Sequence, residues 1–179
     1  MNIGRLVART VIGGLFIGHG TQKLFGWFGG PGLEGTEGMM ESLELNPKRP
    51  NAVAAGVAET AGGALLVTGL ATPLASSALI GAMVTAIRKV HAPSGLWATQ
   101  GGYEYNLVLI AALLALAEDK PGDLSVDNAL GLEFTGFRWS LASLALGTAA
   151  SGATIWLGQQ QTARREGGPS VQKDDQPVG

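Results

Sequence analysis

Long stretches of this chain carry almost no charge, and they are the first guide to its fold. Residues 73–87 contain no charged side chain, and residues 51–71 contain only Glu59. A soluble amphipathic helix needs a polar face, which these segments lack. The pattern predicts an all-α protein, an integral membrane bundle of transmembrane helices. The charge-poor segments are residues 3–24, 51–71, 73–87, 105–117 and 137–158.

The segments differ in how well they fit a bilayer. Residues 105–117 would cover only about 20 Å at 1.5 Å per residue, against about 30 Å of hydrocarbon. We expect this helix to extend into adjoining residues or to lie where the bilayer is thinner. Two alternatives stay open. The first segment resembles a secretory signal, although bulky and charged residues stand where a cleavage site should be, and the whole chain could be a soluble bundle of buried helices.

The composition supports a membrane protein and excludes several kinds of chemistry. Of the 179 residues, 46% are hydrophobic and 15% are charged, against about 25% charged in an average soluble domain. The net charge of −2 gives no reason to expect nucleic acid as a partner. Because the chain has no cysteine, disulfides, thiolate metal sites and iron–sulfur clusters are excluded.

Small residues recur four positions apart in the apolar segments. In lipid, helices associate through close backbone contact rather than through hydrophobicity. We therefore expect these positions to form packing seams, and the adjacent glycines at 62 and 63 to admit a neighbouring helix or a ligand. The expected seams are Gly14 with Gly18, Ser77 with Gly81 and Thr85, and Ser143 with Gly147 and Ser151.

Polar side chains gather at one end of the predicted helices. The turn at Thr72 and Pro73 is too short for anything but an antiparallel hairpin, so the first and third segments end on the side where the second and fourth begin. Lys89 also lies there, and we expect it to reach the interface. The candidate site residues at this end, or extending inward from it, are His19, Lys23, Glu59, Arg88, His91, Glu104 and Asn106.

Glu59 is the most informative of these residues. It lies about eight residues into the second segment, roughly 12 Å below that membrane face, where an unpaired charge costs about 2.5–3.5 kcal/mol. Glu59, and with it Glu104, should therefore pair with His19, Lys23, Arg88 or His91. Histidine exchanges protons near neutral pH, and a carboxyl group removed from water can do so too. The cluster therefore predicts proton-coupled chemistry on a membrane-dissolved carrier such as a quinone.

Both long connections at this end carry aromatic residues. Trp27 and Phe28 follow the first segment, and Trp97 precedes the fourth. Aromatic side chains usually anchor a protein at the membrane interface. The alternative is that they roof the polar site.

Five short motifs surround the predicted polar site. They are FIGHGTQKLFGWFGG (16–30), AETAGG (58–63), GLATPLA (69–75), MVTAIRKVH (83–91) and GGYEYNLVL (101–109). In this order they resemble the DoxX family of small bacterial and archaeal membrane proteins, over about residues 3–127. The resemblance implies a four-helix membrane core and places the family's characteristic polar positions on the seven candidate residues. Because relatives include the small subunit of thiosulfate:quinone oxidoreductase, it also implies a quinone-linked redox role.

The predicted organisation has three parts. Residues 1–127 form the DoxX-like membrane domain, residues 128–158 a linker and an extra C-terminal hydrophobic helix, and residues 159–179 a disordered polar tail rich in Gly, Pro, Gln and charge. The chain is expected to cross the cell membrane several times. Lys and Arg counts favour long connections in the cytoplasm, whereas the family pattern tends toward a cytoplasmic amino terminus, so the orientation stays open.

Three functions fit these expectations. The first is a membrane subunit of an oxidoreductase complex that binds a quinone and receives electrons from a soluble partner, because the chain has no flavin, haem or iron–sulfur motif and no covalent cofactor is expected. Whether the chain is itself an enzyme stays open. The second is a non-catalytic scaffold that recruits soluble oxidoreductase or stress-response proteins.

The third function is a small-molecule or ion transporter that uses Glu59 as its coupling carboxylate. Four short helices leave little room for alternating access, so this function calls for a homo-oligomer. No metal site is expected, because the Glu-x-x-His spacing of di-metal bundle sites is absent.

Overall fold

The computed structural model describes residues 3–120 and 122–166, and over these residues its regular structure is entirely helical. The all-α prediction is confirmed for this part of the chain. A π-helical turn, Ile87–His91, and three short 3₁₀ turns lie between the α-helices. The α-helices are α1 (Ile3–Phe25), α2 (Gly32–Ser42), α3 (Lys48–Thr68), α4 (Thr72–Ala86), α5 (Glu104–Glu118), α6 (Val126–Ala129) and α7 (Phe137–Glu166).

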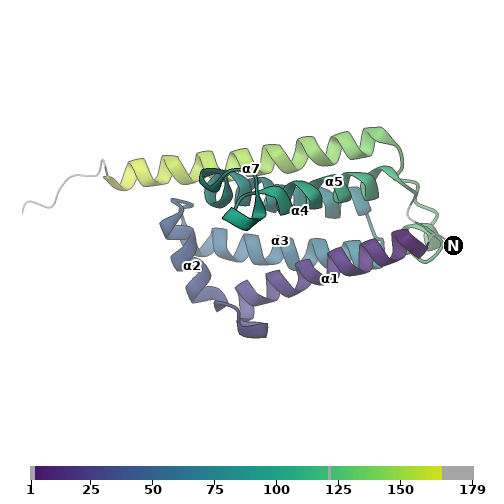
Figure 1. The fold of residues 1–179 in the computed structure, drawn as a ribbon, viewed down its shortest axis with the longest axis horizontal. Helices are drawn as coiled ribbons and strands as arrows, with labels where there is room; N and C mark the ends of the chain where they lie inside the picture. The colour runs from purple at the N-terminus through teal and green to yellow at the C-terminus, as the bar shows by residue number, and fades with distance from the viewer. Residues whose placement is uncertain (1–2, 121, 167–179) are drawn as a thin grey trace, which may run out of the picture.

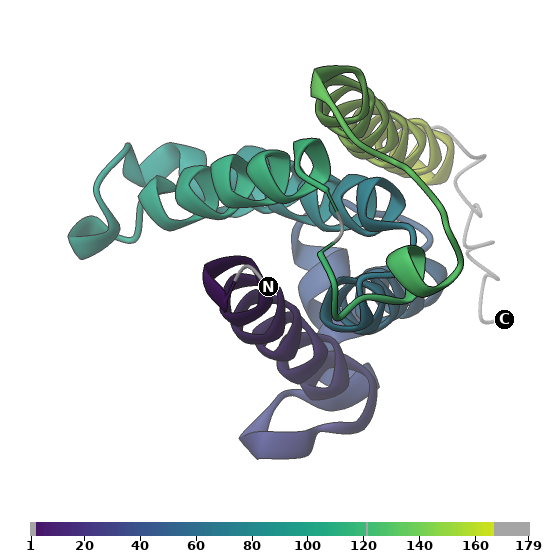
Figure 2. The same ribbon diagram turned by 90° about the vertical axis from the view of Figure 1, so that its right-hand side faces the viewer.

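Five helices run along the long axis of the molecule, and successive ones point in opposite directions (Figure 1). These are α1, α3, α4, α5 and α7, which correspond to the five charge-poor segments. α2 crosses one end of the bundle, where α1 finishes and α3 begins. We call this the α2 end, and residues 87–103 lie there too. Figure 2 looks along the bundle from the opposite end and shows α7 on its outer edge.

The hairpin between α3 and α4 is built by glycine at one helix end and a distant carboxylate at the next. Gly69 (φ 66°) ends α3 in the left-handed region, and Leu70 N donates to the carbonyl of Leu65 at 3.0 Å, which satisfies a carbonyl at the helix end. The carboxylate of Asp127 accepts hydrogen bonds from Ala71 N at 2.9 Å and Thr72 N at 3.4 Å. A negative group at a helix amino terminus is favourable, so α6 fixes the start of α4.

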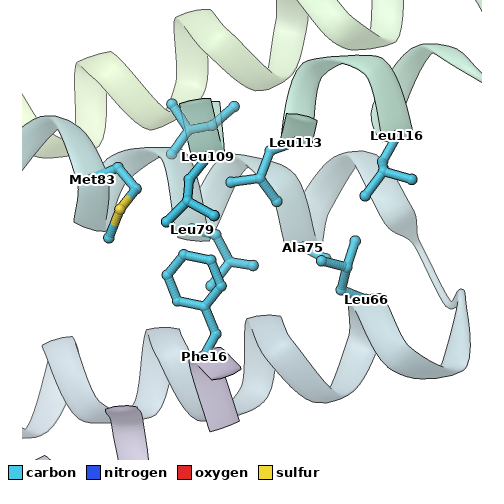
Figure 3. Close-up of a cluster of buried hydrophobic side chains, with 9 residues drawn as sticks. Phe16, Leu66, Ala75, Leu79, Met83, Leu109, Leu113 and Leu116 are labelled. Atoms are coloured by element: carbon cyan, nitrogen blue, oxygen red, sulfur yellow. The ribbon is translucent and has the colours of Figure 1, made fainter. Parts of the chain in front are cut away.

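The apolar core lies where α1, α3, α4 and α5 meet. Phe16 extends from α1 toward Leu79 of α4, and Leu66 and Ala75 close the layer near the hairpin (Figure 3). Each is at most 3% exposed. The other members of this cluster, from α4 and α5, are Ile80, Met83, Leu109, Leu113 and Leu116.

The contact between α1 and α3 uses glycine, but not the pair that the spacing indicated. A Cβ atom at Gly13 would lie 2.6 Å from the carbonyl oxygen of Gly63, so the two backbones touch. A Cβ atom at Gly14 or Gly18 would meet no other element within 4 Å, and the prediction of a seam there is wrong within this chain. Neighbouring helix positions point about 100° apart, so moving one residue along α1 changes the face.

The predicted seams of α4 and α7 meet each other. A Cβ atom at Gly147 would lie 2.7 Å from the carbonyl oxygen of Ser77 and 3.0 Å from the backbone nitrogen of Gly81. Beside this crossing, Thr85 Oγ1 and Ser151 Oγ share a hydrogen bond of 2.8 Å. Small residues therefore bring the C-terminal helix into direct backbone contact with the bundle.

Two segments expected to lack regular structure contain helix. The connection between the first two long helices contains α2, and α7 continues beyond residue 158 to Glu166. A Cβ at Gly158 would lie 2.7 Å from the carbonyl oxygen of Glu44, and Asn46 Nδ2 donates to Thr162 Oγ1 at 2.9 Å. The first part of the predicted disordered tail is therefore helical because it packs on the turn before α3. The rest, residues 167–179, lies outside the described residues.

Candidate functional site

Glu59 is buried, and its partner is Lys23. The residue is 4% exposed, and its Oε2 atom forms an ion pair with Nζ of Lys23 from α1. The Lys23 side chain is itself only 21% exposed. A buried carboxylate needs such a partner because desolvation without one costs several kcal/mol. Of the four partners that the sequence allowed, the structure pairs Glu59 with this one.

A cavity of about 400 Å³ lies on one side of this ion pair. We call it the α1/α5 cavity, because those two helices supply most of its walls and make few contacts with each other. The apolar part of its wall comes from Ile12, Leu15, Phe16 and Leu109. Five of the seven candidate residues line it, namely His19, Lys23, Glu59, His91 and Asn106.

The polar groups of this cavity come from separate elements. His19 and Lys23 are one turn apart on α1, His91 ends the π-helical turn, and Asn106 lies in the first turn of α5. His91 Nδ1 lies 2.8 Å from the carbonyl oxygen of Gly101, and the nearly buried Asn106 contacts Met83 Sδ through its Nδ2 at 3.3 Å. Thioether sulfur is a weak acceptor, so this amide retains most of its hydrogen-bonding capacity.

Glu104 shapes the cavity without lining it. Its Oε2 atom accepts a hydrogen bond from the backbone nitrogen of Ala98 at 3.0 Å. Ala98, Gly101 and Gly102 do line the cavity, so the carboxylate holds the covering segment in place.

Arg88 and Lys89 occupy the reverse of their expected positions. Arg88 is exposed and does not line the α1/α5 cavity. The Lys89 side chain, in contrast, is 16% exposed, and its Nζ lies 3.8 Å from Glu44 Oε2. Both belong to the π-helical turn, whose i→i+5 hydrogen bonds widen the helix. The rule that residues three or four apart share one face of an α-helix therefore fails there. No local feature of the sequence indicates the π-helical turn.

A second cavity, of about 280 Å³, lies on the other side of the ion pair. We call it the α3/α7 cavity, and Lys23 and Glu59 line it as well. Lys89 also reaches it, and Met39 and Met40 of α2 cover it together with Leu43, which follows that helix. These residues were missed by reasoning from the sequence, because α2 itself was expected to be a loop.

The three aromatic residues expected either to anchor the protein or to roof the site stand apart from both cavities. Trp27 is 56% exposed, Phe28 77% and Trp97 59%, and none of them lines either cavity. The rings of Trp27 and Phe28 contact edge to face, with centroids 6.4 Å apart. This placement favours interface anchors over a roof on the polar site.

The molecular surface is more apolar than parts of its interior. Along one side of α1, Ile3, Val7, Val11 and Leu15 are each about half exposed or more, while Arg9 on the same helix is 2% exposed. Glu59, Asn106 and Asp127 are likewise buried. Large exposed apolar surface in a soluble protein is unusual, so this arrangement fits a lipid environment.

The model of the DoxX family matches residues 4–92, about half of the chain. The chain belongs to the DoxX family. The match contains His19, Lys23, Glu59, Arg88 and His91, whereas α5, α6 and α7 lie beyond it. A DoxX domain implies a membrane protein. No curated protein and no solved structure matches the DoxX chain.

Helix length and composition by themselves identify one membrane-crossing candidate among the described residues, Phe137–Arg164 within α7. In this DoxX protein α4 and α5 have only 15 residues each. α1 and α3 carry charge inside their length, namely Arg5, Arg9 and Lys23 in α1 and Lys48, Arg49 and Glu59 in α3.

Proposed function

We propose that this DoxX protein is a multi-pass protein of the cell membrane whose α1/α5 cavity binds a quinone or a similar apolar redox carrier. The observation that carries the proposal is the buried Lys23–Glu59 ion pair at the wall of a mostly apolar cavity that also holds two histidines and an amide. Charged groups inside membrane proteins are expensive, and they mark ligand or proton pathways.

A four-helix membrane core with α7 as a further helix is part of the proposal. The apolar outer side of α1 supports it, as does the close glycine packing between helices. α4 continues through the π-helical turn, so this helical segment runs from Thr72 to His91. That length corresponds to about 30 Å at 1.5 Å per residue, which matches the hydrocarbon thickness.

The chemistry of the cavity suits a quinone ring. A quinone offers two carbonyl oxygens as acceptors, and the cavity offers the Lys23 ammonium, the Asn106 amide and the ring N–H of His19 as donors. The apolar wall suits an isoprenoid chain. Since α1 and α5 make few contacts, the cavity opens sideways between them, which allows entry from the lipid.

Reduction of a quinone to a quinol consumes two electrons and two protons. The ion pair and the two histidines supply groups that exchange protons at the cavity wall. The electrons must come from elsewhere, because the chain carries no flavin, haem or iron–sulfur motif. We therefore include a soluble redox protein as the electron-donating partner.

The test is binding of a short-chain quinone to the purified protein in neutral maltoside detergent, followed by quenching of tryptophan fluorescence. Asn106→Leu removes a buried hydrogen-bonding group at the cavity, which is worth about 1–3 kcal/mol, so Kd should rise about tenfold. Asn128→Leu changes an exposed amide at the opposite end and should leave Kd unchanged. The proposal is abandoned if quenching does not saturate or if both variants bind as the native protein does.

A further inference from the structure

The α3/α7 cavity is a second site, on the other side of the Lys23–Glu59 ion pair from the α1/α5 cavity. α2, α3, α4 and α7 build it, with Ala150, Ser151 and Thr154 as the contribution of α7. α7 lies beyond residues 4–92, the part matched by the DoxX model. The wall formed by α7 therefore comes from outside the part of the chain that the family model matches.

Most of the wall of the α3/α7 cavity is apolar, and its charged groups are Lys23, Glu59 and Lys89. Small side chains leave the space open, among them Ala54 and Ala58 on α3 and Ala78 and Ala82 on α4. The methionine side chains of α2, Met39 and Met40, cover it. Apolar cavities do not hold water well and take up apolar groups instead. At about 280 Å³ the cavity is at the small end of ligand sites, so it suits one alkyl chain rather than two.

The charged side chains at the α2 end of the cavity form two ion pairs of different strength. Lys23 and Glu59 neutralise each other inside the protein. Lys89 is mostly buried, and its Nζ lies 3.8 Å from Glu44 Oε2, which is longer than a charge-assisted hydrogen bond of about 2.7–2.9 Å. The Glu44 side chain is 64% exposed, so water screens much of its charge. The Lys89 ammonium at the polar edge of an apolar space is therefore only weakly compensated.

We propose that the α3/α7 cavity binds an amphipathic anion, a carboxylate on a single alkyl chain. The carboxylate lies at Lys89, and the chain lies along the alanines of α3 and α4. The proposal does not depend on quinone binding, although Lys23 and Glu59 line both cavities.

The experiment uses 11-(dansylamino)undecanoate, a fluorescent carboxylate with one alkyl chain, and the full chain in neutral maltoside. Saturable, blue-shifted emission is expected with the native protein. Lys89→Gln should raise Kd at least about tenfold, since a hydrogen bond to a charged group contributes about 1.5–3 kcal/mol. Its control, Lys48→Gln, changes an exposed lysine at the same end and should leave Kd unchanged.

A second pair of variants tests the chain rather than the charge. Ala54→Phe fills the mouth of the cavity, and because Ala54 is exposed the fold should tolerate the larger side chain. It should abolish the saturable signal. Ala111→Phe is the matched control, an exposed alanine of α5 that lines neither cavity.

Competition identifies the ligand. Decanoate should displace the probe, and decanol, which lacks the charge, should need at least tenfold more. Equal displacement by both would overturn the proposal, as would displacement by phosphatidylglycerol at lower concentration than decanoate, which would assign the cavity to a lipid headgroup. Equal emission from all variants would show partition into the micelle only and would overturn it as well. Asn106→Leu should bind the probe normally, so failure here and failure of quinone binding are distinguishable.

Discussion

Removing the ammonium group of Lys23 tests whether the buried ion pair holds α1 against α3. The variant Lys23→Met retains the apolar stem of the side chain but leaves the Glu59 carboxylate, whose side chain is 6% exposed, without this cation. Breaking a buried pair by removing one partner costs about 3–5 kcal/mol, because the remaining charge stays desolvated. For a chain of this size that corresponds to a fall in Tm of about 6–20 °C.

The matched control is an exposed pair at the same end of the bundle. Lys48 Nζ lies 2.8 Å from Glu41 Oε2, with side chains 42% and 56% exposed. Exposed pairs contribute about 0–1 kcal/mol. Lys48→Met should therefore lower Tm by only a few degrees, even though the distance between Lys48 and Glu41 is that of a normal ion pair. Burial, and not the presence of an ion pair, decides the difference.

The assay is thermal unfolding in maltoside, followed by circular dichroism at a fixed scan rate. The double variant Lys23→Met with Glu59→Gln removes both charges and should recover part of the lost stability, so the two single losses should not add. The reasoning is refuted if Lys23→Met unfolds within about 2 °C of Lys48→Met. It is refuted equally if the double variant loses the sum of the single effects.

Three further predictions concern packing, capping and the membrane interface. Gly147→Leu should destabilise the protein by about 1–3 kcal/mol, because the new side chain would overlap the backbone of α4. Gly14→Leu should change Tm little, because a Cβ atom there would meet no other element within 4 Å. Equal effects of the two variants would contradict the packing seam between α4 and α7. Asp127→Ala, which removes the buried cap of α4, should cost about 1–3 kcal/mol, and Glu133→Ala, exposed in a loop, should cost less than about 0.5 kcal/mol. In nanodiscs, lipids brominated near the headgroup should quench Trp27 more than lipids brominated near the chain ends; the reverse order would place this aromatic turn away from the interface.

The part of the fold that followed from the sequence is the part set by local composition. Each charge-poor segment is a helix, and the short turn after Leu70 does join antiparallel neighbours. The second segment, expected to run to residue 71, ends as a helix at Thr68, with Gly69 as its cap. These features depend on residues within a few positions of each other, so one sequence suffices to find them.

Features that depend on helix rotation were less predictable. Positions 13 and 14 are both glycine, so the residue type does not distinguish them. A Cβ atom at Gly13 would nevertheless meet Gly63, whereas one at Gly14 would meet no other element within 4 Å. The π-helical turn had the same effect at the end of α4, where it turned Arg88 outward and Lys89 into a cavity. Which face of a helix is buried is decided by the partner helix, and that partner lies far along the chain.

By itself, the sequence determined that helices would form, that Glu59 required a cationic partner, and that the polar residues would gather at one end. Tertiary structure alone decided that Lys23 is that partner, that two cavities flank the pair, and that α7 stays helical to Glu166 by packing on the turn before α3. The physical reason is that helix formation and the cost of burying a charge are local properties. The position of one side chain relative to another 36 residues away depends on how whole helices pack.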